Sequence, residues 1–468
     1  MNKRCLWLVP ACCLLVSIAR AYGQEPDSVR MAQYREERSL IQRLEGEIPE
    51  TLGTTWDFGG WYRFSYTRFD DFEKDREATD HDIRLWGSLT FQDIHQLYVR
   101  GRMDLIRWAR GDSFDGNDHD VVGPNLDQGW YRFRMAKFAQ KYFKRKWPVD
   151  VDIKLGRQYI EIGRGEVLSE ILDAGTLEVG NFYFNALVFA SQTPSSRHNL
   201  DISAPKFWHD RRDIYGFQAS LKNVIPKNQP YVFGVFVDDR NKYEPVVPGQ
   251  AFGYSPNYIG FGNRGYLLAD LRYWSESTWE WGTSHATGSL REENIRASAF
   301  VTGAEYLASW CPTHPRVELE YGMGSGDSDR GSATNTIGGN LPFTDDKTFL
   351  AYGYHDTGVA FAPRLANLSV LRVTGSFRPF DWWDRLRNFE IGASWYWYEK
   401  DKSTGGVSDA RAALPSHDLG TEYDLFATWR ITSDLLWTVR YGKFSQGDAF
   451  IDNDDEREYV LTTITYSF

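Results

Sequence analysis

The sequence is poor in cysteine and in long apolar runs. Three of its four cysteines, Cys5, Cys12 and Cys13, lie close to the N-terminus, and only Cys311 follows them. If the N-terminal segment is removed, a single cysteine remains, which excludes an intrachain disulfide and a cysteine-ligated metal cluster. A membrane-spanning helix requires about 20 consecutive apolar residues, and no stretch after that segment is so long. The sequence therefore predicts no spanning helix beyond its N-terminal apolar run.

The N-terminal run has the pattern of a secretory signal peptide. The basic start "MNKR" precedes the apolar stretch "CLWLVPACCLLVSIA", and small residues follow at Ala19, Ala21 and Gly23. We expect residues 1–23 to be a cleaved signal, with an uncleaved anchor as the alternative. The first 21 residues hold three basic residues and no acidic one, so their removal leaves 50 Lys and Arg against 64 Asp and Glu. A chain this acidic is not a general nucleic-acid binder.

Aromatic residues are abundant although the chain is polar on average. It holds 18 Trp, 26 Tyr and 29 Phe, yet its mean hydropathy is −0.50. This combination suits a wall that is apolar on one side and wet on the other. The one helical pattern lies in residues 24–50, where an apolar stripe is thin. We expect residues 24–53 to form a solvated periplasmic arm, with a coiled-coil partner or a plug as the alternative.

From Trp56 onward, apolar residues recur at every second position. "WDFGGWYRFSYTRF" places Trp56, Phe58 and Tyr62 on one face and Trp61 and Arg63 on the other. "NFEIGASWYWYE" and "DLLWTVRYGKF" alternate in the same way. Such alternation indicates a sheet with one apolar and one polar face.

Eighteen segments fit this strand pattern. They cover residues 56–68, 80–92, 95–109, 127–140, 149–159, 170–181, 184–192, 209–222, 228–238, 263–274, 278–286, 294–308, 315–324, 362–378, 386–399, 419–431, 434–446 and 457–468. The connections after odd segments are mostly long and acidic, as in "GDSDRGSATNTIGGNLPFTDDK", whereas those after even segments are short, as in "TSD". The pattern predicts an all-β fold, a transmembrane antiparallel β-barrel of about 18 strands over residues 54–468, with long extracellular loops and short periplasmic turns. A large soluble propeller is the alternative, but no blade-like repeat is present.

If the apolar face meets lipid, the other face lines the lumen of the barrel. Basic residues predominate there, although the chain is acidic. They are Arg63, Arg84, Arg100, Arg102, Arg132, Arg134, Lys154, Arg212, Arg272, Arg316, Arg372, Arg378, Arg430 and Arg440. The acidic residues on the same face are Asp104, Asp150, Asp152, Asp270, Glu318, Glu320, Glu390 and Asp424.

Two interpretations of these lumen charges remain open. Inward Arg and Asp pairs can brace the wall of a wide, water-filled barrel, as Arg102 and Asp104 on one strand face suggest. Alternatively, guanidinium groups, whose planar fork matches carboxylates, form a pathway for anions and set selectivity. The excess of arginine on many strands favours the anion pathway.

Two short motifs add a resemblance. "DIKLGRQYIEIGRGEVL" carries Gly156-Arg157-Gln158 on a strand with inward basic residues, and "EYGMGSGDSDRG" ends a strand with Gly324-Ser325-Gly326-Asp327 before a long loop. Together with the strand number and the arginine-lined lumen, they resemble the alginate export family of outer-membrane proteins, over about Trp56 to Phe468.

The resemblance implies that a polyuronate, alginate, diffuses through a basic constriction, with long loops gating the pore. Arg157 is carried over from the family pattern as a constriction residue. Strict alternation from Lys154 points Arg157 outward, so this role requires a β-bulge at Gly156.

The sequence offers no basis for catalysis or for a bound cofactor. The histidines lie at segment ends or in loops, and no Ser/His/acid set occupies adjacent outward strand faces, so no catalytic residue and no metal site are expected. "DGNDHD" at 115–120 resembles a short calcium loop but lacks the following glutamate, which favours a solvated acidic loop.

We therefore expect a multi-pass barrel of the bacterial outer membrane, with both termini periplasmic, that passively exports an anionic polysaccharide or its oligomers. A general anion-selective porin and a structural or adhesive barrel are the alternatives. Expected partners are lipid and lipopolysaccharide, the barrel assembly machinery and periplasmic secretion components. In the closing "EYVLTTITYSF", Ile464, Tyr466 and Phe468 should face lipid, and Thr463 and Thr465 the lumen, because this strand must close the barrel against the one beginning at Trp56.

Overall fold

Strands dominate the computed structural model, which describes residues 53–70, 74–114, 116–195, 198–204, 210–243, 247–451 and 456–468. The expected signal peptide, and the expected arm apart from Gly53, lie outside these residues. The strands are β1 Thr54–Asp70, β2 Asp75–Phe91, β3 His95–Trp108, β4 His119–Arg134, β5 Asp150–Ile162, β6 Leu168–Gly180, β7 Phe184–Gln192, β8 Arg212–Leu221, β9 Asn228–Asp239, β10 Ser255–Tyr266, β11 Leu271–His285, β12 Glu292–Leu307, β13 Arg316–Gly324, β14 Leu368–Phe377, β15 Phe389–Lys400, β16 Asp418–Arg430, β17 Leu435–Gln446 and β18 Glu456–Ser467. The described helices are α3 Met135–Phe143 and the 3-10 helix η1 Arg240–Tyr243. Among the described residues, no helix is long and apolar enough to cross a membrane.

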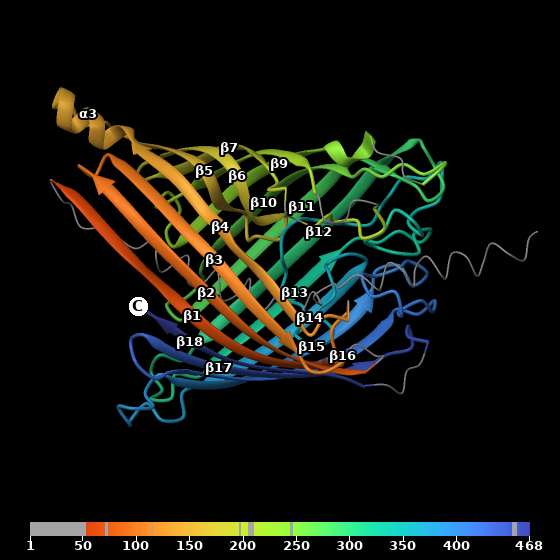
Figure 1. Ribbon diagram of the computed structural model, residues 1–468. Coiled ribbons are helices and arrows are strands. Elements are labelled where there is room, and N and C mark those ends of the chain that lie inside the picture. The colour runs from red at the N-terminus through yellow and green to blue at the C-terminus, as the bar shows by residue number, and fades with distance from the viewer. Residues whose placement is uncertain are drawn as a thin grey trace, which may run out of the picture.

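The strands form one closed antiparallel barrel. Each strand pairs with its neighbours in sequence, and β1 also pairs with β18, with Tyr62 opposite Tyr466 and Phe69 opposite Tyr459. Figure 1 shows β1, at the red end of the colour range, beside the dark blue β18. The predicted fold, strand number and closing pair are therefore confirmed.

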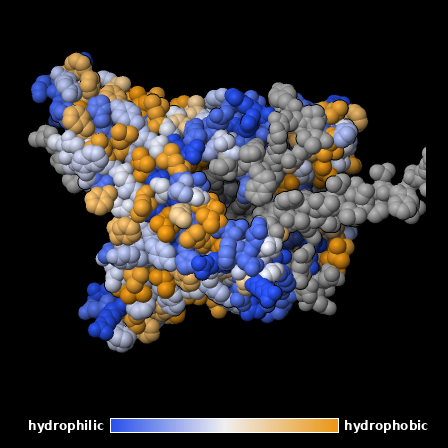
Figure 2. All heavy atoms as spheres, in the orientation of Figure 1, coloured by the Kyte–Doolittle hydropathy of each residue, from blue (hydrophilic) through white to orange (hydrophobic). Residues whose placement is uncertain are grey.

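The two faces of β1 show why the alternation predicts this wall. Trp61 and Arg63 are 2% and 3% exposed and face the lumen, whereas Trp56 and Phe58 are 75% and 84% exposed on the outer face. Figure 2 shows apolar side chains spread over the outer surface of the wall. An outer surface this apolar is stable in the hydrocarbon of a bilayer, as expected for a multi-pass β-barrel.

The ends of the barrel differ as predicted. The turns after β2, β6 and β16 span only residues 92–94, 181–183 and 431–434, whereas the loops after β7 and β13 span residues 193–211 and 325–367. We call these the turn end and the loop end. In Figure 1 the loops extend to the right and the turns lie to the left. One loop-end connection, residues 163–167, is short but folds into the lumen, as described below.

Two segment predictions were wrong in position. The predicted strand 263–274 contains the turn that joins β10 to β11, and the predicted strand 278–286 is only the second part of β11. The turn residues Leu267 and Leu268 are apolar and exposed, so the hydrophobic pattern continues across the turn and conceals it.

The predicted strand 127–140 also differs from the structure. β4 ends at Arg134, and the following residues form α3, which was not predicted. Met135, Phe138, Ala139 and Tyr142 recur at helical spacing, but the helix is only nine residues long and directly follows a strand, so the strand prediction was extended into it.

The seam between β1 and β18 generates the first prediction. The N–H of Phe468 donates to the carbonyl of Gly60 at 3.0 Å, and the N–H of Gly60 donates to the carbonyl of Phe468 at 2.9 Å. A side chain at position 60 would come within 2.9 Å of the Phe468 ring, so the ring packs over the glycine. Deleting Phe468 removes both hydrogen bonds from a lipid-exposed site, where each unpaired backbone group costs several kcal/mol.

We expect deletion of Phe468 to lower the yield of folded barrel in the membrane. The measurement is the fraction of heat-modifiable protein in the outer-membrane fraction. Phe468→Tyr, which keeps the backbone pair and the ring, is the control and should retain the yield. Normal yield of the deletion variant would contradict the role assigned to the seam.

Candidate functional site

A tightly paired cluster of charges lies on β1 to β4. Asp82 accepts from Arg63 at 2.7 Å and forms an ion pair with Arg84 at 3.0 Å, while Asp127 pairs with Arg100 at 2.5 Å. The register places these residues together, because Arg63 is opposite Asp82, and Arg84 lies two positions along the same face.

Burial and stacking add to this cluster. Arg84 and Arg100 are 0% and 1% exposed, and their guanidinium groups lie 5.4 and 5.3 Å from the ring of Trp61. On β3, Arg102 pairs with Asp104 at 2.6 Å. Buried charges require such partners, since an unpaired charge is expensive to desolvate. The buried Arg63, Arg84 and Arg100 therefore brace the wall, as the alternative interpretation of the lumen charges expected for part of the set, whereas Arg102 stays partly exposed.

The predicted basic residues of β4 and β5 lie near the turn end. Arg132 is opposite Lys154 and Arg134 is opposite Asp152. Arg132 approaches Asp152 only to 3.8 Å, and the Lys154 ammonium lies 4.1 Å from the ring centroid of Trp130. These side chains keep partial exposure, so they are open to a solute in the lumen.

Further lumen-facing basic residues lie at the same end of other strands. Arg272 pairs with Glu305 at 3.0 Å, and Arg316 and Arg378 approach Glu390 to 3.3 and 3.9 Å. Arg430 is the last residue of β16, beside the turn 431–434. We call Arg132, Arg134, Lys154, Arg272, Arg316, Arg378 and Arg430 the turn-end ring. Their partial exposure distinguishes them from the buried Arg63, Arg84 and Arg100.

Arg440 faces the lumen from the interior of β17. It is opposite Phe426 and Leu461, and its side chain is partly exposed. Within the part of the chain that the structure describes, neither Arg430 nor Arg440 has an ion-pair partner.

Arg157 lies on the outer face, and the predicted β-bulge at Gly156 is wrong. The register of β5 with both neighbours runs without a shift through Gly156. Arg157 therefore shares the face of the exposed Leu155, and it binds Asp173 through two hydrogen bonds of 2.7 and 3.0 Å. Gly156 has a φ of +124°, and a side chain there would meet the Gly129 carbonyl at 2.3 Å, which explains the glycine without a bulge.

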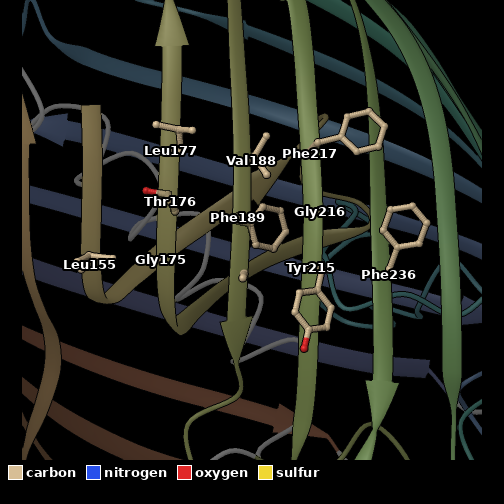
Figure 3. Close-up of a pocket in the computed structure, with 11 residues that line it drawn as sticks. Leu155, Gly175, Thr176, Leu177, Val188, Phe189, Tyr215, Gly216, Phe217 and Phe236 are labelled. Carbon is tan, nitrogen blue, oxygen red and sulfur yellow. The ribbon is translucent and has the colours of Figure 1, made fainter. Parts of the chain in front are cut away.

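The same outer face carries a shallow apolar groove of about 540 Å³. It spans β5 to β9, where the small residues Gly175 and Ala190 lie between Leu155, Val188 and Tyr215. Figure 3 shows the side chains along this groove, including Phe217 and Phe236. Leu155 and Val188 are exposed on the outer surface, so the groove belongs to the lipid-facing wall and not to the lumen.

Two loop-end connections fold into the lumen, through contacts that the sequence did not predict. In residues 163–167, the N–H of Gly163 donates to Gln218 at 2.7 Å and the N–H of Arg164 donates to Glu276 at 3.0 Å. These acceptors lie on the lumen faces of β8 and β11. The second connection, residues 325–367, joins the first, because the N–H of Tyr352 donates to the Val167 carbonyl at 3.0 Å.

The predicted residues Arg372, Glu318 and Glu320 meet at this loop. The Arg372 guanidinium donates to Glu318 at 2.5 Å and to Glu320 at 2.8 Å, and it also binds Asp356 of the 325–367 loop. Glu320 accepts a further bond from Arg164 at 2.8 Å. Arg372 therefore connects the wall to an inserted loop.

His355 and Glu166 complete this junction between the loops. His355 lies 3.6 Å from Glu166 and 3.8 Å from Glu320. Burial raises the pKa of Glu166, but the nearby Arg164 guanidinium and His355 lower it more, so the net shift of this pKa is downward and the carboxyl stays ionised. Within the described ranges, no group of three or more His, Cys, Asp or Glu side chains could hold a metal ion.

Two wall carboxylates hold the rest of the 325–367 loop. Glu422 on β16 accepts from the backbone N–H groups of Val359, Ala360 and Phe361 at 2.6, 2.7 and 2.8 Å. It also accepts from the Tyr398 hydroxyl at 3.1 Å. Gly358, with a φ of +94°, makes the turn that aligns these three N–H groups. A carboxylate with four donors is strongly satisfied in a buried site.

The second carboxylate is Glu280 on β11. It accepts from the N–H of Leu350 at 3.1 Å and from the Tyr254 hydroxyl, while the Tyr258 hydroxyl donates to the Leu350 carbonyl at 2.5 Å. The sequence contained a signal for both acids, because Glu280 and Glu422 each occupy a lumen position within a strand rich in aromatic residues. Their loop partners are remote in sequence and gave no such signal.

Comparison with known proteins gives a family match over part of the chain and a set of structures with the same fold. The sequence model of the alginate export family, described as alginate export, matches residues 246–462. A search of curated protein sequences found no match. The second predicted motif, at Gly324–Asp327, lies in the matched region, whereas Gly156-Arg157-Gln158 lies outside it.

Solved outer-membrane structures share the fold at low identity. OccK8 (OprE) of Pseudomonas aeruginosa superposes with a TM-score of 0.55 and 10% identity, covering 88% of this chain and 98% of that one. OccK5 (OpdH) of the same organism gives 0.53 and 9%, with the same coverage. OccAB2 of Acinetobacter baumannii gives 0.54 and 9%, again covering 88% of this chain and 98% of that one. The predicted resemblance is thereby confirmed: residues 246–462 carry the pattern of the alginate export family, on β10 to β18 of an 18-stranded outer-membrane barrel.

Proposed function

We propose that this barrel is a passive outer-membrane pore through which an anionic polysaccharide, an alginate-like polyuronate, or its oligomers are exported. The match to the alginate export family and the outer-membrane barrel fold support a pore. The observation that carries the polyanion is the turn-end ring, which gathers partly exposed basic residues from β4, β5, β11, β13 and β16 and from the connection after β14 in an acidic protein.

The chemistry of the ring suits a long polyanion. Glu305 lies 3.0 Å from Arg272, but two other acidic partners, Asp152 and Glu390, lie 3.3 Å or more from the nearest basic nitrogen. Exposed ion pairs in a hydrated lumen are weak. A uronate carboxylate can therefore exchange with them at little cost. Many weak sites bind a polymer through several contacts while each contact still releases quickly.

The proposal also assigns the orientation of the barrel in the membrane. Short turns of outer-membrane barrels lie in the periplasm, so the ring is the mouth that a polymer meets on its way out. The C-terminal Phe468 lies at this end, near the turn after β2. Outer-membrane lipid and lipopolysaccharide, the barrel assembly machinery and periplasmic secretion components are the partners that this role requires.

A general anion-selective porin is the second candidate. The two inserted loops narrow the lumen, which favours small solutes over a polymer unless the loops move. The two functions differ in whether an oligouronate competes with small anions for the pathway.

Reversing charge in the turn-end ring tests the proposal. In the double variant Arg134→Glu with Arg430→Glu, we expect the anion-to-cation permeability ratio in planar bilayers to fall roughly tenfold. This factor corresponds to a change of about 1.4 kcal/mol in the free energy of an anion in the lumen relative to a cation. Block of the chloride current by oligouronate should disappear in the same variant.

The matched control is Arg157→Gln, which removes a positive charge from the outer face and should leave selectivity unchanged. Absence of block by oligouronate in the unaltered protein would reject the polysaccharide and favour the general porin. A sealed barrel that stays non-conducting after loop release would favour a structural or adhesive role.

Releasing the inserted loop tests its role as a gate. Glu422→Ala leaves three buried backbone N–H groups without an acceptor, at about 1–3 kcal/mol each. We therefore expect the 358–361 segment to leave the wall and single-channel conductance to rise. Thr428→Ala, on the lumen face of the same strand, is the control. Unchanged conductance in Glu422→Ala, with the barrel still folded, would show that this loop does not limit the pathway.

A further inference from the structure

The helix α3 is a feature that transport through the lumen does not use. It follows β4 at the turn end and projects beyond the wall of the barrel, at the upper left of Figure 1. The short turns 92–94 and 181–183 at this end contain no helix. Among the described residues, α3 is the only α-helix, and it lies at this end.

One side of α3 continues the aromatic outer surface of the wall. The Phe138 ring lies 5.5 Å from that of Phe133 on β4, and Phe133 lies 5.4 Å from His95 on β3. The Tyr142 hydroxyl donates to Gln92 in the adjacent turn at 3.0 Å. The helix is thus fixed against the outer rim, at the level where barrels carry an aromatic girdle in the membrane interface.

Aromatic side chains at the C-terminal end of α3 remain uncovered. Phe143 is 70% exposed, and Trp147, a few residues further on, is 39% exposed. Exposed rings at the rim of a membrane protein are stabilised when they enter the boundary between headgroups and acyl chains.

The same segment is strongly basic. From Met135 to Trp147 it contains Lys137, Lys141, Lys144, Arg145 and Lys146 and no acidic residue. Lys144, Arg145 and Lys146 are exposed. In a chain with 64 acidic and 53 basic residues, five basic side chains in so short a segment are a local reversal of charge. The polar side of α3 is therefore complementary to anions.

We propose that α3 and residues 144–147 form a binding surface for anionic phospholipid headgroups in the leaflet at the turn end. Basic side chains attract the phosphate, and Phe143 and Trp147 enter the acyl boundary beside it. A hydrophilic polyuronate could use the charges but would leave both rings exposed to water. Only a lipid satisfies both sides of the segment.

The test uses the full-length barrel in phosphatidylcholine vesicles with a minor fraction of phosphatidylglycerol. Cys311→Ser with Phe143→Cys carries a fluorophore at position 143, and quenching by nitroxide-labelled phosphatidylglycerol is compared with quenching by nitroxide-labelled phosphatidylcholine. We expect phosphatidylglycerol to quench several-fold more strongly. The preference should disappear in Lys144→Gln, Arg145→Gln, Lys146→Gln, because each basic residue near the surface adds to the attraction.

The matched control is the fluorophore on the native Cys311, in the turn 308–315 at the same end. Equal quenching by the two lipids at position 143, or the same preference at Cys311, would overturn the proposal. Loss of the preference on adding soluble oligouronate would assign the surface to the polymer instead. Heat-modifiable mobility in each variant confirms that the barrel is folded.

Discussion

The constraint on which this structure depends is that hydrocarbon offers no hydrogen-bond partner to the backbone. Every strand N–H and carbonyl within the membrane must therefore pair with another strand, which requires a closed sheet. The pairing of β1 with β18 satisfies that requirement and fixes the remaining properties of the wall. Once the sheet is closed, alternate side chains must face lipid and lumen, so Trp56 and Phe58 lie outside while Trp61 and Arg63 lie inside.

A second constraint acts inside the barrel, because a buried charged group needs a hydrogen-bond or ion-pair partner. Near the loop end, wall carboxylates meet this constraint with loop backbone: Glu422 binds three N–H groups and Glu280 binds Leu350. On β1–β3 the compensation is between side chains, as in the pair of Arg63 and Asp82. At the turn end the pairs of Arg132 with Asp152 and of Arg378 with Glu390 lengthen to 3.8 and 3.9 Å, and the side chains become more exposed. The lumen thus changes from fixed, internally satisfied charge to charge that a solute can reach.

The sequence predicted the features of the fold that depend on local alternation of apolar and polar residues, but not the contacts between remote segments. The strands, their number and the seam follow from a period of two, which the membrane enforces. The turn at Leu267 and Leu268 was missed because apolar turn residues continue the pattern. The helix α3 was missed because its helical pattern covers only nine residues directly after a strand. Arg157 shows the limit of carrying over a motif: alternation placed it outside, and the structure agrees with alternation. The inserted loop could not be predicted, because contacts such as that of Glu422 with Val359 join remote residues without a local pattern.

The seam also has a consequence for how the molecule folds. Ser65 on β1 lies beside Thr463 on β18, 398 positions later in the chain. All other strand pairs join neighbours in sequence, so they can form early and with small loss of chain entropy. The closing pair cannot form until the last strand is available, and until then both edges expose unpaired backbone that invites aggregation. Closure is therefore the slowest topological step, and the segment from Glu456 to Phe468 determines when a chain stops being an open sheet and becomes a barrel.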